Sequence, residues 1–367
     1  MISSGVHASI RHLLPMRWSF LSRPSCSVTR KSCLQYGPTH RDMMSTLTKS
    51  RQIPLTQGTS VKSDLEQPYR IEELLTHGGE SGLHVYRASA QGKQYIMENT
   101  IPGDFQHQVN LQKQLSLCPN IRTAVDSVRE TEVFFYPFLD GDLLRFSQRN
   151  LSKETRKSIL RSALQGLVEM HAKDMVHNDI KPNNILIDYT EPAVEDQETT
   201  LIKEVQISDL EDTVIVPPGK WLRGPLCGNA IWRSAESWAR SRLNQASDVF
   251  SFALVMVYVM ANEMVLRVPD EQLNAEDSWR HVLRLHLSYF ADIEGVERFL
   301  EHIGEQNPFF ERILELINTF GPGNPRQPVE HWDFLEPELK DLVAKMTYLD
   351  PRGRITSKEA LEHPWFR

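Results

Sequence analysis

Cysteine is scarce in this chain of 367 residues, and closely spaced cysteines are absent. The four that occur are Cys26, Cys33, Cys118 and Cys227, and no two of them form a C-x-x-C pair. Structural zinc sites and small disulfide-stapled domains both depend on such spacing, so neither is expected. Scattered cysteines of this number are typical of reduced thiols in an intracellular protein.

Long apolar runs and a basic charge balance are absent too. The longest apolar run, Phe252 to Ala261, is far shorter than the roughly 20 residues that a helix needs to cross a bilayer. We therefore expect a buried core helix there and no transmembrane segment. The formal net charge is −7, which argues against the basic surface on which nucleic-acid binding depends. The sequence does not indicate an oligomeric state.

The first 50 residues differ in composition from the rest. They hold seven Lys or Arg residues but a single acidic residue, Asp42, and are rich in serine. A basic, serine-rich and acid-poor leader is typical of a mitochondrial transit peptide, although a tail without a targeting role can have the same composition. We therefore expect an intracellular protein, mitochondrial if the leader is functional and cytoplasmic otherwise. Residues 51–68 are predicted to be a polar linker.

From Tyr69 onward the pattern becomes that of a folded domain. Three short runs rich in β-formers come first, separated by glycine-containing turns. The runs are residues 83–87, 94–97 and 133–136. A helical stretch at about 105–117 lies between the second run and the third.

After Leu151 the pattern is mainly helical. Ser152 precedes a stripe of apolar residues at helical spacing that runs to Met170. The order of elements predicts an α+β fold with two lobes. The first is small and β-rich, about residues 69–137, and the second is larger and helical, about residues 142–367.

Eight residues from His177 to Asn184, His-Asn-Asp-Ile-Lys-Pro-Asn-Asn, place a base, a cation and an amide close together. Asp179 can accept a proton from a hydroxyl, Lys181 can neutralise charge on a moving phosphoryl group, and Asn184 can offer its carbonyl oxygen to Mg²⁺. These are the groups that a phosphoryl-transfer loop requires.

This stretch resembles the catalytic loop of protein kinases, His-Arg-Asp-Leu-Lys-x-x-Asn, and differs from it at two positions. Four later residues match further marks of that family: Asp209 of its Asp-Phe-Gly, Glu236 of its Ala-Pro-Glu, Asp248 of its Asp-Val-Trp-Ser-Phe and the late arginine Arg354. The resemblance covers about residues 69–367 and implies the bilobal protein-kinase-like fold.

The resemblance also assigns roles to these residues. It implies ATP and Mg²⁺ as cofactors, a protein as substrate, and Asp209 as a second Mg²⁺ ligand beside Asn184. In the family, the residues at Glu236 and Arg354 form a buried ion pair. The aspartate at Asp248 braces the catalytic loop through backbone amides.

A rival family shares part of the catalytic loop. Aminoglycoside-type small-molecule kinases carry a similar stretch, but they usually lack both the lysine matched by Lys181 and the later framework. The pattern therefore favours a protein kinase, and Lys181 resembles the serine/threonine type.

The part that would grip the nucleotide phosphates departs from the family pattern. Alignment of residues 95–98 with the family's Val-Ala-Ile-Lys puts Glu98 at the lysine position, where a carboxylate repels phosphate. Lys93 lies five residues earlier and would point to the opposite face of a regular strand. On the following helix, Gln108 and Asn110 are nearest to the position of the partner glutamate.

Two segments are expected to contact the nucleotide. The glycine-rich loop supplies Gly78, Gly79, Gly82 and Val85. Its glycines lack the family's regular Gly-x-Gly-x-x-Gly spacing. At the hinge between the lobes, the family binds adenine through one carbonyl and an amide two residues later. Pro137 and Leu139 are therefore the expected contacts.

Regulation by phosphorylation is not expected. Asn178 replaces the arginine that would clamp an activation-loop phosphate. Between Asp209 and Glu236, the only hydroxyl residues are Thr213 and Ser234.

Two functions remain open from the sequence. The first is an atypical serine/threonine protein kinase, in which another cation replaces the missing lysine. The second is a pseudokinase, a kinase-fold scaffold or nucleotide-binding module. The catalytic loop favours the first, and Glu98 with the irregular glycine loop favours the second.

Overall fold

The computed structural model describes residues 54–77, 83–191, 200–223 and 226–367, and these belong to one compact unit. The leader expected over residues 1–50 lies outside the described residues, as do the expected nucleotide contacts Gly78, Gly79 and Gly82.

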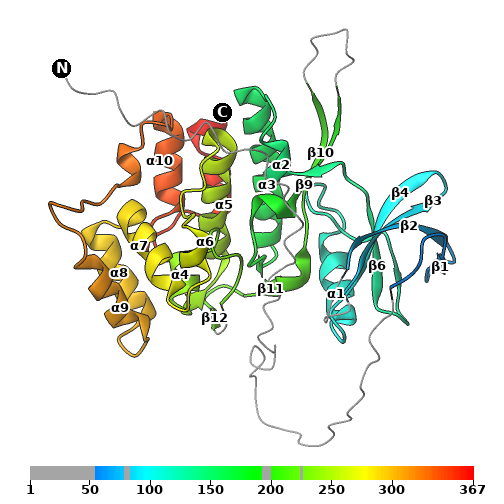
Figure 1. Cartoon of the computed structure of the whole chain (residues 1–367), viewed down its shortest axis with the longest axis horizontal. Helices are drawn as coiled ribbons and strands as arrows, with labels where there is room; N and C mark the ends of the chain where they lie inside the picture. The colour runs from blue at the N-terminus through cyan, green and yellow to red at the C-terminus, as the bar shows by residue number, and fades with distance from the viewer. Residues whose placement is uncertain (1–53, 78–82, 192–199, 224–225) are drawn as a thin grey trace, which may run out of the picture. The chain divides into compact units, whose positions relative to one another are not determined.

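Within the described residues, six strands form a sheet in the order β1-β2-β3-β4-β6-β5, and every pairing is antiparallel (Figure 1). They are β1 Ser60–Lys62, β2 Pro68–Thr76, β3 Val85–Ala90, β4 Lys93–Asn99, β5 Asp126–Val128 and β6 Val133–Pro137. Helix α1 (Phe105–Leu115) connects β4 to β5 and buries Phe105, Leu111 and Leu115. The β-rich first lobe predicted from the sequence is confirmed.

The linker expected over residues 51–68 is wrong in part, because β1 lies inside it. Ser60 pairs with Arg70 and Val61 with Tyr69 in an antiparallel ladder. A strand of serine, valine and lysine is too short and polar to show as a strand in the sequence. Residues 60–62 therefore form a strand because they pair with the longer strand β2.

The C-terminal part is mainly helical, as predicted. Helix α3 (Lys153–His171) begins where the Ser152 hydroxyl accepts the amide of Thr155 at 3.0 Å, and it buries the apolar stripe seen in the sequence. Helix α5 (Gln245–Ala261) contains the longest apolar run and is buried over most of its length. In the part of the chain that the structure describes, no helix is long and apolar enough to cross a membrane.

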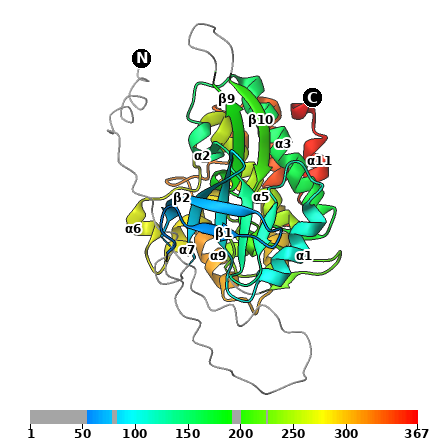
Figure 2. The ribbon, with the colours of Figure 1, turned by 90° about the vertical axis from the view of Figure 1, so that its right-hand side faces the viewer.

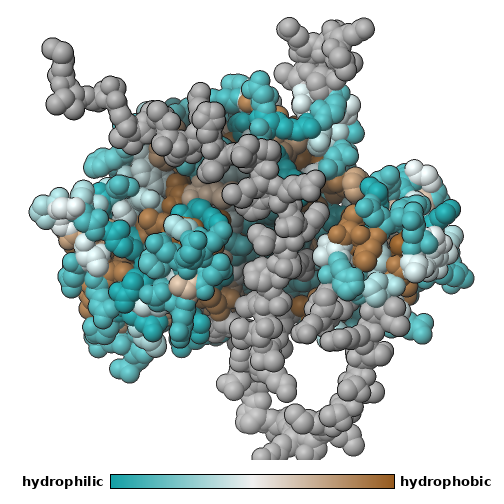
Figure 3. Space-filling view, in the orientation of Figure 1, coloured by the Kyte–Doolittle hydropathy of each residue, from teal (hydrophilic) through white to brown (hydrophobic). Residues whose placement is uncertain are grey.

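The other helices lie around these two (Figure 1). They are α2 Leu143–Phe146, α4 Ala235–Trp238, α6 Asp270–Leu273, α7 Ser278–Phe290, α8 Ile293–Ile303, α9 Phe309–Ile317, α10 Pro337–Met346 and α11 Ser357–Leu361. On the face seen in Figure 3, the surface of this part is mostly hydrophilic, as expected of helices that turn their apolar side inward.

Short strands complete the C-terminal part. They are β7 Gly141–Asp142, β8 Met175–Val176, β9 Ile185–Thr190, β10 Leu201–Ile207, β11 Val214–Ile215, β12 Leu222–Arg223 and β13 Arg242–Leu243. Figure 2 shows β9 and β10 side by side, flanked by α2 and α3. Ile185 of β9 pairs with Ile207 of β10, so the loop that precedes β9 lies beside the segment that follows β10.

Candidate active site

The loop from His177 to Asn184 brings its chemical groups together. The Asn184 amide donates to the Asp179 carboxylate (Nδ2–Oδ2, 3.2 Å) and to the Asp179 carbonyl oxygen (2.9 Å). The Lys181 ammonium donates to the same carboxylate oxygen. Oδ2 of Asp179 is thus occupied, whereas Oδ1 is buried without a hydrogen-bond partner among the described residues.

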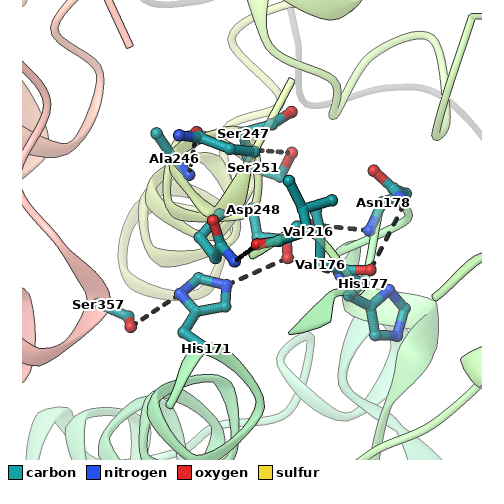
Figure 4. A network of polar contacts seen from close by, with 12 residues as sticks. His171, Val176, His177, Asn178, Val216, Ala246, Ser247, Asp248, Ser251 and Ser357 are labelled. Carbon is teal, nitrogen blue, oxygen red and sulfur yellow. Dashed lines mark hydrogen bonds and ion pairs between the residues drawn. The ribbon is translucent and has the colours of Figure 1, made fainter. Parts of the chain in front are cut away.

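A buried carboxylate on α5 holds this loop in place. The backbone amides of His177 and Asn178 both donate to Asp248, at 2.7 Å to Oδ2 and 2.9 Å to Oδ1 (Figure 4). The ring of His171 lies 3.2 Å from Oδ2, and its other nitrogen lies 2.9 Å from the Ser357 hydroxyl. Charge-assisted bonds of this kind are strong. The brace implied by the resemblance is therefore present.

Asn178 has a structural role that was not predicted from the sequence. Its φ of 68° is left-handed, a conformation that asparagine tolerates better than most residues. Its amide donates to the carbonyl oxygen of Asp212 at 2.9 Å, which ties the loop to the segment after Asp209. From the sequence, Asn178 counted only as the loss of an arginine, because a bond to a distant backbone carbonyl leaves no sequence pattern.

Asp209 follows β10 and is held beside the loop through its neighbour Ser208. The Ser208 amide donates to the carbonyl oxygen of Asn184 at 2.8 Å, and the Ser208 carbonyl accepts from His177 Nε2 at 2.9 Å. Asp209 itself has a left-handed backbone, with φ 63°. The structure thus gathers the predicted catalytic and metal-binding residues at one place.

The predicted metal ligands suit Mg²⁺. Asn184 donates its Nδ2 to Asp179, which leaves its carbonyl oxygen for a cation. Asp209 supplies a carboxylate, and both are the hard oxygen donors that Mg²⁺ prefers. Among the described residues, no three His, Cys, Asp or Glu side chains are grouped to hold a metal by themselves.

Burial raises the pKa of the Asp179 carboxyl above its ordinary value. Lys181 acts in the opposite direction, and the nearby Asp209 carboxylate adds to the increase. A carboxylate whose pKa is raised is a better proton acceptor than an ordinary aspartate, as general base catalysis requires.

The framework pair predicted by the resemblance is formed. Arg354 and Glu236 make two bonds, Nη1–Oε1 at 2.6 Å and Nη2–Oε2 at 3.2 Å, and both side chains are fully buried. Burial works to raise the pKa of Glu236, but the Arg354 guanidinium outweighs it and holds that pKa below its usual value. The pair anchors the helical part beneath the site.

Glu98 lies where the sequence alignment placed it, near the end of β4. It stands opposite Val85 on β3, another expected nucleotide contact, and opposite Phe134 on β6. Lys93 begins the same strand and is exposed, so it does not replace the missing cation. Glu98, Gln108 and Asp209 line a small cavity of about 30 Å³, which has room for roughly two water molecules.

On α1, Gln108 is the residue that faces the site. It is buried, and its amide donates to the carbonyl oxygens of Leu210 (3.2 Å) and Glu211 (3.5 Å). Asn110, the other residue considered from the sequence, is exposed. A neutral hydrogen bond to the segment after Asp209 therefore stands where the family has a charged partner for its lysine.

The hinge carbonyl expected to bind adenine already has a partner. Arg122 donates from Nε (3.2 Å) and Nη2 (2.7 Å) to the carbonyl oxygen of Pro137. Leu139, two residues later, is buried. Arg122 was not predicted as a site residue, since a single arginine between a helix and a strand carries no signal of the fold that brings it there.

Residues 91–366 match a family model described as the protein kinase domain. The curated relatives include the phosphorylase b kinase gamma catalytic chain, liver/testis isoform, of Rattus norvegicus, 23% identical over 298 residues, which are 79% of this chain and 60% of that one. They also include mitogen-activated protein kinase kinase 2 of Arabidopsis thaliana, 24% identical over 259 residues, which are 69% of this chain and 58% of that one. The chain thus spans about 60% of the length of such relatives.

Proposed function

Because the chain belongs to the protein kinase family, we propose that it transfers the γ-phosphoryl group of Mg·ATP to a serine or threonine hydroxyl of a protein substrate. The observation that carries this proposal is the arrangement at Asp179. One carboxylate oxygen is held by Lys181 and Asn184, and the other is buried without a partner among the described residues.

Asp179 is the base in this scheme. A buried acceptor without a hydrogen-bond partner is uncommon in folded proteins and fits a group that meets its partner in the substrate. Oδ1 of Asp179 would accept the hydroxyl proton, while Lys181 and Asn184 fix the carboxylate through Oδ2. A fixed base contributes through position as well as through its pKa.

Asn184 and Asp209 would hold the metal, and Lys181 would stabilise charge on the transferred group. When bound, Mg²⁺ supplies neutralisation of the phosphate oxygens. The serine/threonine preference rests on Lys181 and on relatives named as phosphorylase kinase and mitogen-activated protein kinases.

Transfer of labelled γ-phosphate to a generic protein substrate tests the role of Asp179. For the full-length chain, Asp179→Asn is expected to lower the rate by about 10²–10⁴-fold, because the proton acceptor is lost. Asp174→Asn is the matched control, since Asp174 precedes the loop and has a left-handed backbone that asparagine tolerates. Undiminished transfer by Asp179→Asn would exclude this residue as the base.

A second function, a kinase-fold module without turnover, is favoured by two specific observations. Glu98 stands where a cation would meet the phosphates, and Arg122 occupies the carbonyl of Pro137. Calorimetry with the wild-type chain separates the two functions. Absence of binding at millimolar Mg·ATP would support the module and contradict the enzyme.

A further inference from the structure

The backbone carbonyl oxygen of Pro137, at the expected adenine-binding hinge, is already hydrogen-bonded within the chain. Proline has no N–H, so this oxygen is the only backbone polar group that the residue offers a ligand. A carbonyl oxygen has two lone pairs, and Arg122 directs two donors at it, Nε at 3.2 Å and Nη2 at 2.7 Å. Its capacity as an acceptor is therefore satisfied within the chain.

The backbone of Arg122 is fixed, so its side chain is not a mobile surface group. The Arg122 amide donates to the carbonyl of Ile207 at 2.8 Å, and the Ile207 amide donates to the carbonyl of Asn120 at 2.9 Å. The same turn packs closely on α3, because a Cβ added to Gly166 would lie only 2.6 Å from the Asn120 carbonyl oxygen. Ile207 lies two residues before Asp209, so this turn is also fixed relative to the metal-binding segment.

The guanidinium of Arg122 is surrounded by groups that suit a buried cation. It lies 4.9 Å from the ring centroid of Tyr136, in cation–π geometry. Burial lowers the pKa of Arg122, and the Glu98 carboxylate acts against that decrease. The Tyr136 hydroxyl accepts from Gln112 at 3.0 Å, which fixes the ring. Glu98, unfavourable for phosphate, is thus the counter-charge of Arg122, since a buried charge is tolerated only with a partner.

We propose that Arg122 is the specificity-determining residue of the nucleotide site: by saturating the Pro137 carbonyl, it removes the acceptor that the 6-amino group of adenine needs. This inference rests on the proposed function for the position of the nucleotide. A purine with a carbonyl at C6 has no such donor and loses nothing from the saturation. With Arg122 in place, the site therefore discriminates against adenine nucleotides relative to 6-oxopurine nucleotides.

Titration calorimetry of the full-length chain with Mg·ATP and with Mg·GTP tests the proposal. Arg122→Val is expected to bind Mg·ATP about tenfold more tightly than the wild type, and the gain for Mg·GTP is expected to be smaller. Arg129→Val is the matched control, because Arg129 is an exposed arginine of the same region, and it should change neither affinity. Equal gains for the two nucleotides, or no gain for Mg·ATP, would overturn the proposal.

Removal of Arg122 takes a positive charge away from the half-buried Glu98 carboxylate, so the double variant Glu98→Gln/Arg122→Val keeps the test interpretable. It preserves charge balance and, like Arg122→Val, is expected to gain more affinity for Mg·ATP than for Mg·GTP. The two proposals fail separately. Tighter Mg·ATP binding without phosphoryl transfer would support the role of Arg122 and contradict the enzyme. Phosphoryl transfer with a KM for ATP that Arg122→Val leaves unchanged would support the enzyme and contradict the role of Arg122.

Discussion

The amide of Gln108 on α1 lies 3.2 Å from the carbonyl oxygen of Leu210, in the segment that follows Asp209. This bond joins the β-rich part to the segment that follows Asp209 through a neutral donor. The family pattern places an acidic residue at this point of the helix. An ionised acidic residue at position 108 would face the carbonyl oxygens of Leu210 and Glu211, whereas the Gln108 amide can donate hydrogen bonds to them.

Replacement of Gln108 tests this relationship. Gln108→Ala removes one of two donors to the Leu210 carbonyl, which keeps the Thr213 amide at 3.1 Å, and is expected to lower the free energy of unfolding by about 1 kcal/mol. Gln108→Glu is expected to cost more at neutral pH, because an ionised carboxylate can only accept. That excess should shrink as pH falls and the carboxyl becomes a donor. Urea denaturation at several pH values measures both, with exposed Lys113→Ala on the same helix as a neutral control.

The raised pKa of Asp179 predicts the pH dependence of transfer. Its carboxylate takes up a proton at a higher pH than an ordinary aspartate, whose pKa is about 4, so the acid limb of kcat/KM should lie above that value. The contribution of Asp179 to folding stability has the opposite pH dependence. A raised folded-state pKa means that the folded state holds the proton more tightly, so this contribution is present at low pH and is lost as pH rises through the raised pKa.

Both consequences of the raised Asp179 pKa can be measured. A pH profile of kcat/KM gives the position of the acid limb. The difference in unfolding free energy between wild type and Asp179→Asn, followed against pH, gives the effect on stability. An acid limb at or below the value for a free aspartate would contradict the burial of this carboxyl.

Gly228 is expected to be intolerant of any side chain. Its φ is +74°, and an added Cβ would lie 2.6 Å from the carbonyl oxygen of Asn178, the residue before Asp179. Gly228→Ala should therefore reduce both stability and transfer. Gly219→Ala is a close control, since Gly219 has the same φ of +74° but open space around it. It should lose only the conformational term, about 1 kcal/mol. Equal effects of the two substitutions would mean that the contact with Asn178 is unimportant.

The buried pair of Glu236 and Arg354 predicts a large loss of stability. Arg354→Ala leaves Glu236 charged and buried without a partner, and is expected to cost about 3–5 kcal/mol in urea denaturation. Arg298→Ala breaks an exposed pair with Glu294, separated by 2.5 Å, and should cost less than about 0.5 kcal/mol. A small effect at Arg354 would show that water reaches the pair after substitution.

The sequence predicted the elements whose signal is local. The apolar stripe of α3, the buried run in α5 and the strand runs at 94–97 and 133–136 all depend on periodicity within a few residues. The catalytic loop was predictable for the same reason, because its base, cation and amide are contiguous. The later framework residues carried enough of the family pattern to be placed correctly.

Contacts between a side chain and a distant carbonyl could not be predicted in this way. Arg122 with Pro137, Asn178 with Asp212 and Gln108 with Leu210 each join segments that only the folded chain brings together. The acceptor in each case is a backbone oxygen, which every residue possesses, so residue identity gives no clue. The departures from the family pattern at Asn178 and Gln108 therefore first looked like losses, although both residues form bonds.

Asp248 has a consequence for motion. It lies in a buried helix and takes the amides of His177 and Asn178, so those two hydrogens are shielded until α5 separates from the loop. Their exchange with solvent deuterium should require an opening close to complete unfolding, whereas amides of the exposed β1 edge should exchange through small local fluctuations. The loop from His177 to Asn184 is thus expected to persist in one geometry through any rearrangement of the β-rich part.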